Sequence, residues 1–139
     1  ALDLDIIGTY NGDSFDFPYL QKRCHFYGLK CPMGYNQSEP VTKRKGTDNA
    51  VRLKGIQHVD AFQLLLLLSR MQVVDLVKFD LESVVNALFG VSKTKIKAEQ
   101  INKIWDSEVG LDELFTYNLE DSAYTLKLVE KYWPLMVEF

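Results

Sequence analysis

The sequence predicts an α/β chain in which helices dominate, organised as one domain over residues 1–139. Two observations lead to this fold class. Apolar residues recur at spacings of three and four along several segments, which is typical of amphipathic helices. By contrast, only two runs, residues 4–10 and 55–59, have the β-branched and aromatic content of strands. Two strands are too few for a stable open sheet, so we expect either further strands outside the chain or an unusual arrangement.

The N-terminal segment is expected to form a strand, a turn and a helix. Residues 4–10 are the strand, and Asn11-Gly12-Asp13 is a strong turn signal. A helix should follow over residues 15–27, with Asp13 or Ser14 as its N-terminal cap. Residues 30–54 have no clear period, which indicates a loop, with short strands as the alternative.

The rest of the chain is expected to be helical after the second strand. Asp60 and Asp80 stand where N-caps belong, and Gly90 ends the second of the two helices that they start. The predicted helices span residues 61–71, 81–89, 98–105 and 111–132. The main apolar stripe of the last helix is expected at Phe115, Leu119, Ala123, Leu126, Val129 and Trp133.

The composition is that of a globular protein, with 47% apolar and 25% charged residues and a net charge of −3. This charge does not exclude a nucleic-acid enzyme, because bound metal offsets the charge of a carboxylate site. No apolar run is long enough to span a membrane, and the acidic start is unlike a signal peptide. Two cysteines are too few for a disulfide framework, so we expect an intracellular, reduced protein without a membrane partner.

Several conspicuous side chains have a structural interpretation. His58 is expected to be a hydrogen-bonding residue of the second strand, His25 a surface residue, and Cys24 a small core residue. Basic residues gather in two clusters, which we interpret as solvated loops. The first cluster comprises Lys43, Arg44, Lys45, Arg52 and Lys54, and the second comprises Lys93, Lys95 and Lys97.

Two acidic positions are candidates for chemistry. Asp16 lies just beyond the strand–helix turn, where strand-end carboxylates often converge on a cleft. Its alternative role is charge complementing the helix dipole. Tyr117 and Asp121 are four residues apart and share one face of the last helix. That face continues into apolar residues, so it should be covered, and a half-buried carboxylate there needs a partner such as a metal ion. The alternative is an ordinary wet helix face.

Taken together, these segments resemble the exonuclease motifs of family B DNA polymerases. Asn-x-x-x-Phe-Asp-x-Pro-Tyr-Leu at residues 11–20 resembles the second motif, and Tyr-x-x-x-Asp at residues 117–121 resembles the third. Between them, Gly-x-x-His-x-Asp at residues 55–60 is similar to a strand of the archaeal members. Residues 79–84 and 88–90 resemble the helix that follows and its exit, so the resemblance covers essentially the whole chain.

The resemblance implies an RNase H-like exonuclease fold in which four carboxylates hold two divalent ions, Mg²⁺ or Mn²⁺. Asp16 and Asp121 would be two of the metal ligands, and Tyr117 would orient the attacking water. Asn11 and Phe15 would lie beside the single-stranded 3′ end of DNA, where Phe15 could stack on a frayed base. The implied activity is proofreading 3′→5′ hydrolysis of the terminal phosphodiester.

One feature of the family pattern has no counterpart here. The family's first motif, Asp-x-Glu, precedes the second by several elements, whereas only Asp3 and Asp5 precede Asn11. We therefore expect a fold truncated at its N-terminal strands, inactive by itself, that associates with the remaining polymerase domains or with a second copy. The open alternatives are a proofreading exonuclease, a non-catalytic domain of an inactivated relative that keeps a structural or DNA-contacting role, and a free-standing nuclease.

Overall fold

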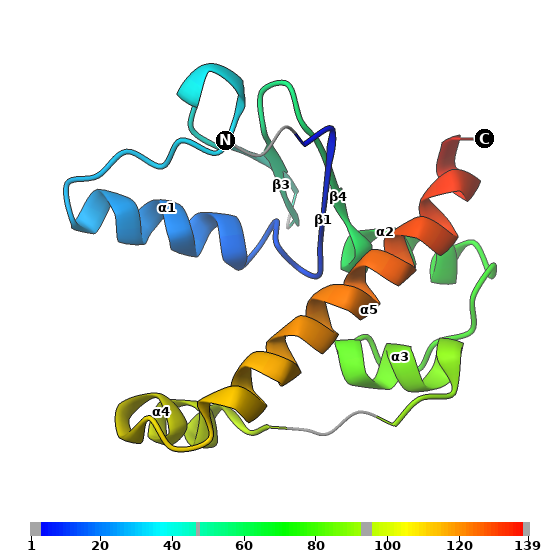
Figure 1. Cartoon of the computed structure of the whole chain (residues 1–139). Helices are drawn as coiled ribbons and strands as arrows, with labels where there is room; N and C mark the ends of the chain where they lie inside the picture. Colours follow the sequence, from blue (N-terminus) through cyan, green and yellow to red (C-terminus); the bar gives the residue numbers. More distant parts are fainter. Residues whose placement is uncertain (1–3, 47, 93–95, 138–139) are drawn as a thin grey trace.

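Figure 1 shows the computed structural model of the chain, in which residues 4–46, 48–92 and 96–137 are described. Two small sheets are present. Strands β1 (Ile6–Thr9) and β4 (Gln57–Asp60) pair in parallel, with Thr9 opposite Asp60. Strands β2 (Val41–Lys45) and β3 (Asp48–Arg52) form an antiparallel hairpin. The two predicted strands are confirmed, with slightly different ends. For residues 30–54, the alternative of short strands is the one observed, as the β2–β3 hairpin.

Helices make up most of the described chain, as the sequence predicted. They are α1 (Asp16–Phe26), α2 (Ala61–Arg70), α3 (Leu81–Phe89), α4 (Ala98–Ser107) and α5 (Leu111–Val137), with a single 3₁₀ turn, η1, at Tyr35–Gln37. The last helix continues past its predicted end and through Pro134. Its last turns pack Tyr132, Trp133, Leu135 and Met136 on the core, and this packing offsets the hydrogen bond that proline removes.

The caps of α2 and α3 are as predicted, but the cap of α1 is not. Asp60 accepts a hydrogen bond from the Phe62 amide, and Asp80 accepts one from the Ser83 amide. By contrast, α1 begins after Phe15 without a side-chain cap. The expected cap, Asp13, turns to the amide of Val51 in β3 instead, with an N···O distance of 2.6 Å. A distant partner therefore took the carboxylate that the local pattern assigned to the helix.

The main core lies between α2, α3, α5 and the β1–β4 sheet (Figure 1). Its buried residues include Val59, Leu65, Leu68, Val84, Leu128, Val129 and Tyr132. Helix α5 crosses β1 closely enough that a Cβ on Gly8 would lie 3.0 Å from Val129. Within the described ranges, no helix combines the length and apolarity that a membrane crossing requires.

The apolar stripe predicted for α5 is largely wrong. Phe115, Leu119 and Leu126 are exposed, whereas Leu114, Thr125, Leu128, Val129 and Tyr132 are buried. The helix carries apolar residues on two faces, and the face that includes Asp121 and Thr125 is the one directed to β1 and α2. The covered face is therefore the one that the sequence ranked second.

The remaining structural interpretations can be placed on the fold. His25 is exposed and pairs with Glu39 at 3.0 Å, as expected of a surface residue, while Cys24 is half-buried. The basic side chains at Lys43, Arg44, Arg52, Lys54 and Lys97 are exposed, which agrees with solvated loops and edges. Asp3, the side chain of Lys45, and Lys93 and Lys95 lie outside the described residues.

Candidate active site

Asp16 and Asp121 meet at one cavity of about 400 Å³. The cavity lies where the end of β1, the first turn of α1, the start of α3 and the middle of α5 come together. Its other lining residues are Gly8, Thr9, Tyr10, Leu81, Asn118, Ser122 and Thr125. The fold thus brings together the two carboxylates that the sequence singled out, although they are far apart along the chain.

The two carboxylates reach the cavity in different ways. Asp16 is the first residue of α1 and follows the turn that leaves β1. The residue is exposed as a whole, but neighbouring atoms desolvate its carboxyl group and raise the pKa above its usual value. Asp121 is half-buried in the middle of α5, one turn before the buried Thr125. The site therefore combines a helix start with the flank of a packed helix.

Tyr117 lies beside this cavity rather than in it. It is one turn before Asp121 on α5 and is half-buried. Its side chain lines a neighbouring hollow of about 500 Å³, together with Ile96, Asp112, Glu113, Thr116 and Glu120.

Asn11 and Phe15 do not line the cavity, although each is next in the chain to a residue that does, Tyr10 and Asp16 respectively. The Phe15 side chain is 62% exposed, and its ring lies parallel to that of Tyr19 with the centroids 5.9 Å apart. Asn11 is half-buried in the left-handed conformation, with φ of 63°. An exposed ring at this position is available to a flat partner from solvent.

Sequence reasoning missed several polar groups of the cavity. Tyr10 donates a hydrogen bond from its hydroxyl group to the carbonyl oxygen of Phe79, and burial raises its pKa well above the usual range. Thr9, Ser122 and Thr125, which carry hydroxyl groups, also line the cavity. A signal existed for each, because Thr9 and Tyr10 end the strand before the turn, and Ser122 and Thr125 lie one and four residues after Asp121.

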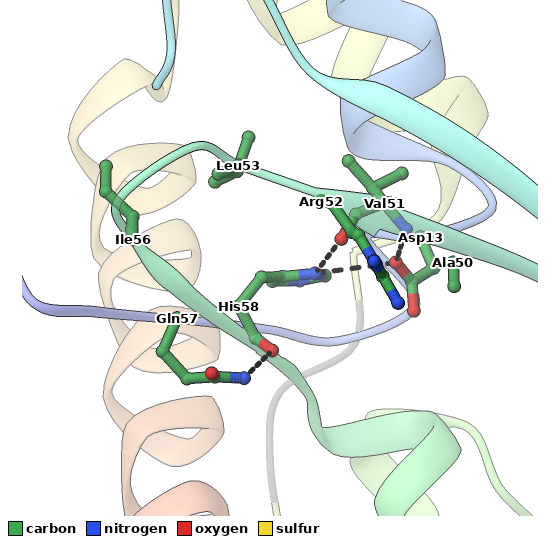
Figure 2. A pocket seen from close by; sticks show the side chains of 8 residues that line it. All are labelled: Asp13, Ala50, Val51, Arg52, Leu53, Ile56, Gln57 and His58. Carbon is green, nitrogen blue, oxygen red and sulfur yellow. Dashed lines mark hydrogen bonds and ion pairs between the residues drawn. The ribbon is translucent and has the colours of Figure 1, made fainter. Parts of the chain in front are cut away.

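Behind the turn lies a buried polar cluster, which we call the turn cluster: Thr9, Asp13, His58 and Asp60. His58 Nδ1 is 3.3 Å from the carbonyl oxygen of Val51 and 3.4 Å from Asp13 Oδ1 (Figure 2). Because a carbonyl only accepts, Nδ1 carries a hydrogen, and Nε2 forms a hydrogen bond of 2.8 Å with the Thr9 hydroxyl group. The structural interpretation of His58 is confirmed.

The donor chemistry of the cavity suits a hard divalent cation. Carboxylate and hydroxyl oxygens are ligands that Mg²⁺ and Mn²⁺ prefer over sulfur or imidazole sites. Two carboxylates line the cavity, and within the described ranges no group of three or more His, Cys, Asp or Glu that could hold a metal ion occurs. The residues present therefore fit part of a divalent metal site.

Comparison with known proteins gives a consistent result. Residues 1–84 match the model of the DNA polymerase family B exonuclease domain. The chain is 40% identical over 133 residues to DNA polymerase 1 of Pyrococcus abyssi. The aligned region covers 96% of this chain and 17% of that protein. It is 38% identical over 133 residues to the DNA polymerase of Thermococcus sp. strain 9oN-7, covering 96% of this chain and 16% of that one.

A solved structure agrees with the sequence comparisons. The family B DNA polymerase from the hyperthermophilic archaeon Pyrobaculum calidifontis superposes with a TM-score of 0.76 and 27% sequence identity. The matched region covers 94% of this chain and 16% of that one. The chain thus spans about a sixth of the length of the proteins it matches.

Proposed function

The chain belongs to the family B DNA polymerases, as part of their exonuclease domain, and from this premise we propose that it contributes to a proofreading 3′→5′ exonuclease. The proposed reaction is hydrolysis of the 3′-terminal phosphodiester of DNA in a protein that also polymerises DNA. Residues 1–139 would form part of a single exonuclease domain, with the remaining polymerase domains as its partners.

The observation that carries this proposal is the shared cavity of Asp16 and Asp121. Each carboxylate lies within one of the two motifs that resemble the family's, and the cavity joins the elements that carry them. An accidental match to one motif would not require the fold to bring the other to the same place. Phe15, the residue before Asp16, also presents an exposed aromatic ring of the kind on which unpaired bases stack.

In the proposed site, Asp16 and Asp121 would hold divalent ions, Mg²⁺ or Mn²⁺. When bound, a pair of such ions supplies an activated water and stabilises the leaving 3′ oxygen. The hydroxyl group of Tyr117, one turn from Asp121, would orient the water. Phe15 would stack on the unpaired terminal base, and Asn11 would lie beside the strand. These two carboxylates are half of the four that the family uses, so the chain alone would bind the ions weakly.

The test is exonuclease activity on a single-stranded oligonucleotide labelled for detection of 3′ digestion. The full-length protein that contains this chain is compared with its Asp16→Asn and Asp121→Asn variants in Mg²⁺ or Mn²⁺. We expect each substitution to lower the rate at least about a hundredfold, because each removes charge that holds an ion. Glu130→Gln, an exposed carboxylate on the same helix as Asp121, is the matched control and should leave the rate unchanged.

The same assay on the 139-residue chain alone should show little digestion. Robust digestion by the chain alone that depends on Asp16 would contradict the four-carboxylate site.

A non-catalytic exonuclease-like domain with a structural or DNA-contacting role is the alternative. An inactive full-length protein, with apolar or neutral residues in place of Asp-x-Glu before Asn11, would establish this alternative.

A further inference from the structure

Asp60 does more than cap a helix. Its Oδ1 accepts hydrogen bonds from the amides of Phe62 at 3.0 Å and Asn11 at 2.8 Å, and its Oδ2 accepts one from the amide of Asp13 at 3.0 Å. The Asp60 side chain is buried, with the residue 7% exposed. The first bond is the cap of α2, and the other two grip the turn on both sides of Gly12.

The grip is transmitted to Asp16 through the backbone. The carbonyl oxygen of Asn11 accepts from the amide of Phe15 at 3.0 Å, and that of Gly12 accepts from the amide of Phe17 at 3.1 Å. These two amides stand immediately before and after Asp16. The orientation of the turn therefore fixes the backbone from which the Asp16 side chain projects into the cavity.

The backbone of the turn at Asn11 and Gly12 has few alternative conformations. Asn11 is held at a positive φ, which few side chains tolerate. A Cβ at Gly12 would lie 2.4 Å from the Thr9 hydroxyl oxygen, so the turn passes too close to β1 for any other residue. A backbone in such a conformation persists only when its surroundings determine it.

The other members of the turn cluster hold the far side of the turn. Asp13 accepts from the Val51 amide at 2.6 Å, and its Oδ1 lies 3.4 Å from His58 Nδ1 (Figure 2). Figure 2 shows Asp13 and His58 directed toward one another between β3 and β4. The turn is thus held from two sheets, by the Asp60 carboxylate of β4 on one side and by the Val51 amide of β3, which binds the Asp13 side chain, on the other.

We propose that Asp60 is a positioning residue for the exonuclease reaction, which sets Asp16 at the cavity by holding the amides of Asn11 and Asp13. This proposal rests on the proposed function, because it concerns the same reaction. Asp60 lies outside the cavity and on β4, whereas Asp16 begins α1; by this route Asp60 controls the turnover rate rather than substrate binding.

The decisive variant is Asp60→Asn in the full-length protein. The carboxamide keeps one oxygen for the α2 cap, since asparagine caps helices as well as aspartate does. Its amino group replaces the second oxygen, so one turn amide would face a donor instead of an acceptor. The matched control is Asp80→Asn, which makes the same change at the cap of α3, where the bond goes to Ser83.

We expect kcat to fall about tenfold or more in Asp60→Asn, while KM for the oligonucleotide stays within about twofold, because a misplaced group weakens the transition state more than binding. Asp80→Asn should change neither value. Thermal melting and the amide resonances of Asn11 and Asp13 are followed in the same proteins. If Asp60→Asn does not fold, Asp60→Ser replaces it, because serine keeps a capping oxygen.

The outcomes separate the two proposals. An Asp60→Asn protein that melts earlier but keeps its kcat would overturn the positioning role, while the loss of activity in Asp16→Asn still stood. Retained exonuclease activity in Asp16→Asn would contradict the proposed function itself. Unchanged amide resonances of Asn11 and Asp13 in Asp60→Asn would also overturn the positioning role, whatever the activity.

Discussion

The helices that carry the two candidate carboxylates are held in opposite ways. Helix α5 packs along its C-terminal half against the core, with Thr125, Leu128, Val129 and Tyr132 buried. Helix α1 projects from the body of the molecule (Figure 1), and Phe17 is its only buried residue. Asp121 therefore takes its position from side-chain packing along α5. Asp16 takes its position from hydrogen bonds at the start of its helix, beside the single packed side chain of Phe17. One site is assembled by two different kinds of force.

The largest expected effect follows from the packed helix. Leu128→Ala should lower the free energy of unfolding by about 2–5 kcal/mol, because it removes a core side chain and leaves a cavity. Leu126→Ala on the same helix should change it by less than about 1 kcal/mol, since Leu126 is 54% exposed and Leu128 only 1%. Urea unfolding followed by circular dichroism measures both. Equal losses in the two variants would show that α5 packs through the stripe that the sequence favoured.

The hydrogen-bonded start of α1 should give a smaller effect. Asp13→Ala leaves the buried Val51 amide without its acceptor, which costs about 1–3 kcal/mol. Ser14→Ala should cost less than about 0.5 kcal/mol, because α1 has no side-chain cap. The same unfolding measurement compares them. A larger loss in Ser14→Ala than in Asp13→Ala would show that Ser14 caps α1, and that the bond from Val51 to Asp13 contributes little to stability.

Local sequence signals predicted the parts of the fold that local forces determine. Helix α3 begins and ends where the Asp80 cap and Gly90 placed it, and the α2 cap at Asp60 was also predicted. The two motifs that carry Asp16 and Asp121 pointed to one cleft because they occur together and in the family's order; residues 11–20 are a specific match, whereas Tyr-x-x-x-Asp alone is weak. The helix caps and ends were predictable because the residues that determine each of them lie within a few positions of each other.

The failures have the opposite property. The covered face of α5 depends on β1, where Gly8 lets Val129 approach, and a helical period cannot choose between two apolar faces. Asp13 lies 38 residues before Val51, the residue whose amide donates to it. The basic hairpin of β2 and β3 alternates too little between apolar and polar residues to be predicted as two strands. The hydrogen bonds of Asp60 to the turn could not be predicted either, because Asn11 and Asp13 lie far from Asp60 in the chain. The local cap of α2 was already a sufficient explanation of the residue.

The weakly packed α1 should also make the chain associate with itself. Large apolar side chains are exposed at the N-cap of this helix and along it: Phe15 at 62%, Tyr19 at 53% and Phe26 at 77%. Exposed patches of this kind bind other surfaces, so we expect concentration-dependent oligomers of the 139-residue chain in sedimentation velocity. Phe26→Glu should shift the population toward monomer, and Val77→Glu, at an exposed residue outside the helices, should not. A monodisperse monomer at micromolar concentrations and above would contradict this expectation.

The smallest expected effect distinguishes a buried carboxyl group from an exposed one. Burial raises the pKa of Asp60 above its ordinary 3.8 and outweighs the hydrogen bonds that act in the opposite direction. The Cys31 amide, followed by His25, lowers the pKa of Glu39 below 4.5. The first group is held by a turn that excludes water, and the second by partners at the surface. Their contributions to stability must therefore depend on pH with opposite signs.

For Asp60, the folded state binds a proton more tightly than the unfolded state, so its ionisation lowers stability as the pH rises from below 3.8 through the raised pKa. For Glu39, the stabilising contribution is present above 4.5 and is lost as the pH falls through the lowered pKa. Urea unfolding between about pH 6 and pH 3.5 measures these two opposite changes in the free energy of unfolding. As the pH falls, the stability of the wild-type chain relative to Asp60→Asn should increase, while its stability relative to Glu39→Gln should decrease. Two difference curves of the same sign would mean that the turn leaves Asp60 solvated, and the hydrogen-bonded position of Asp16 would then lack its buried anchor.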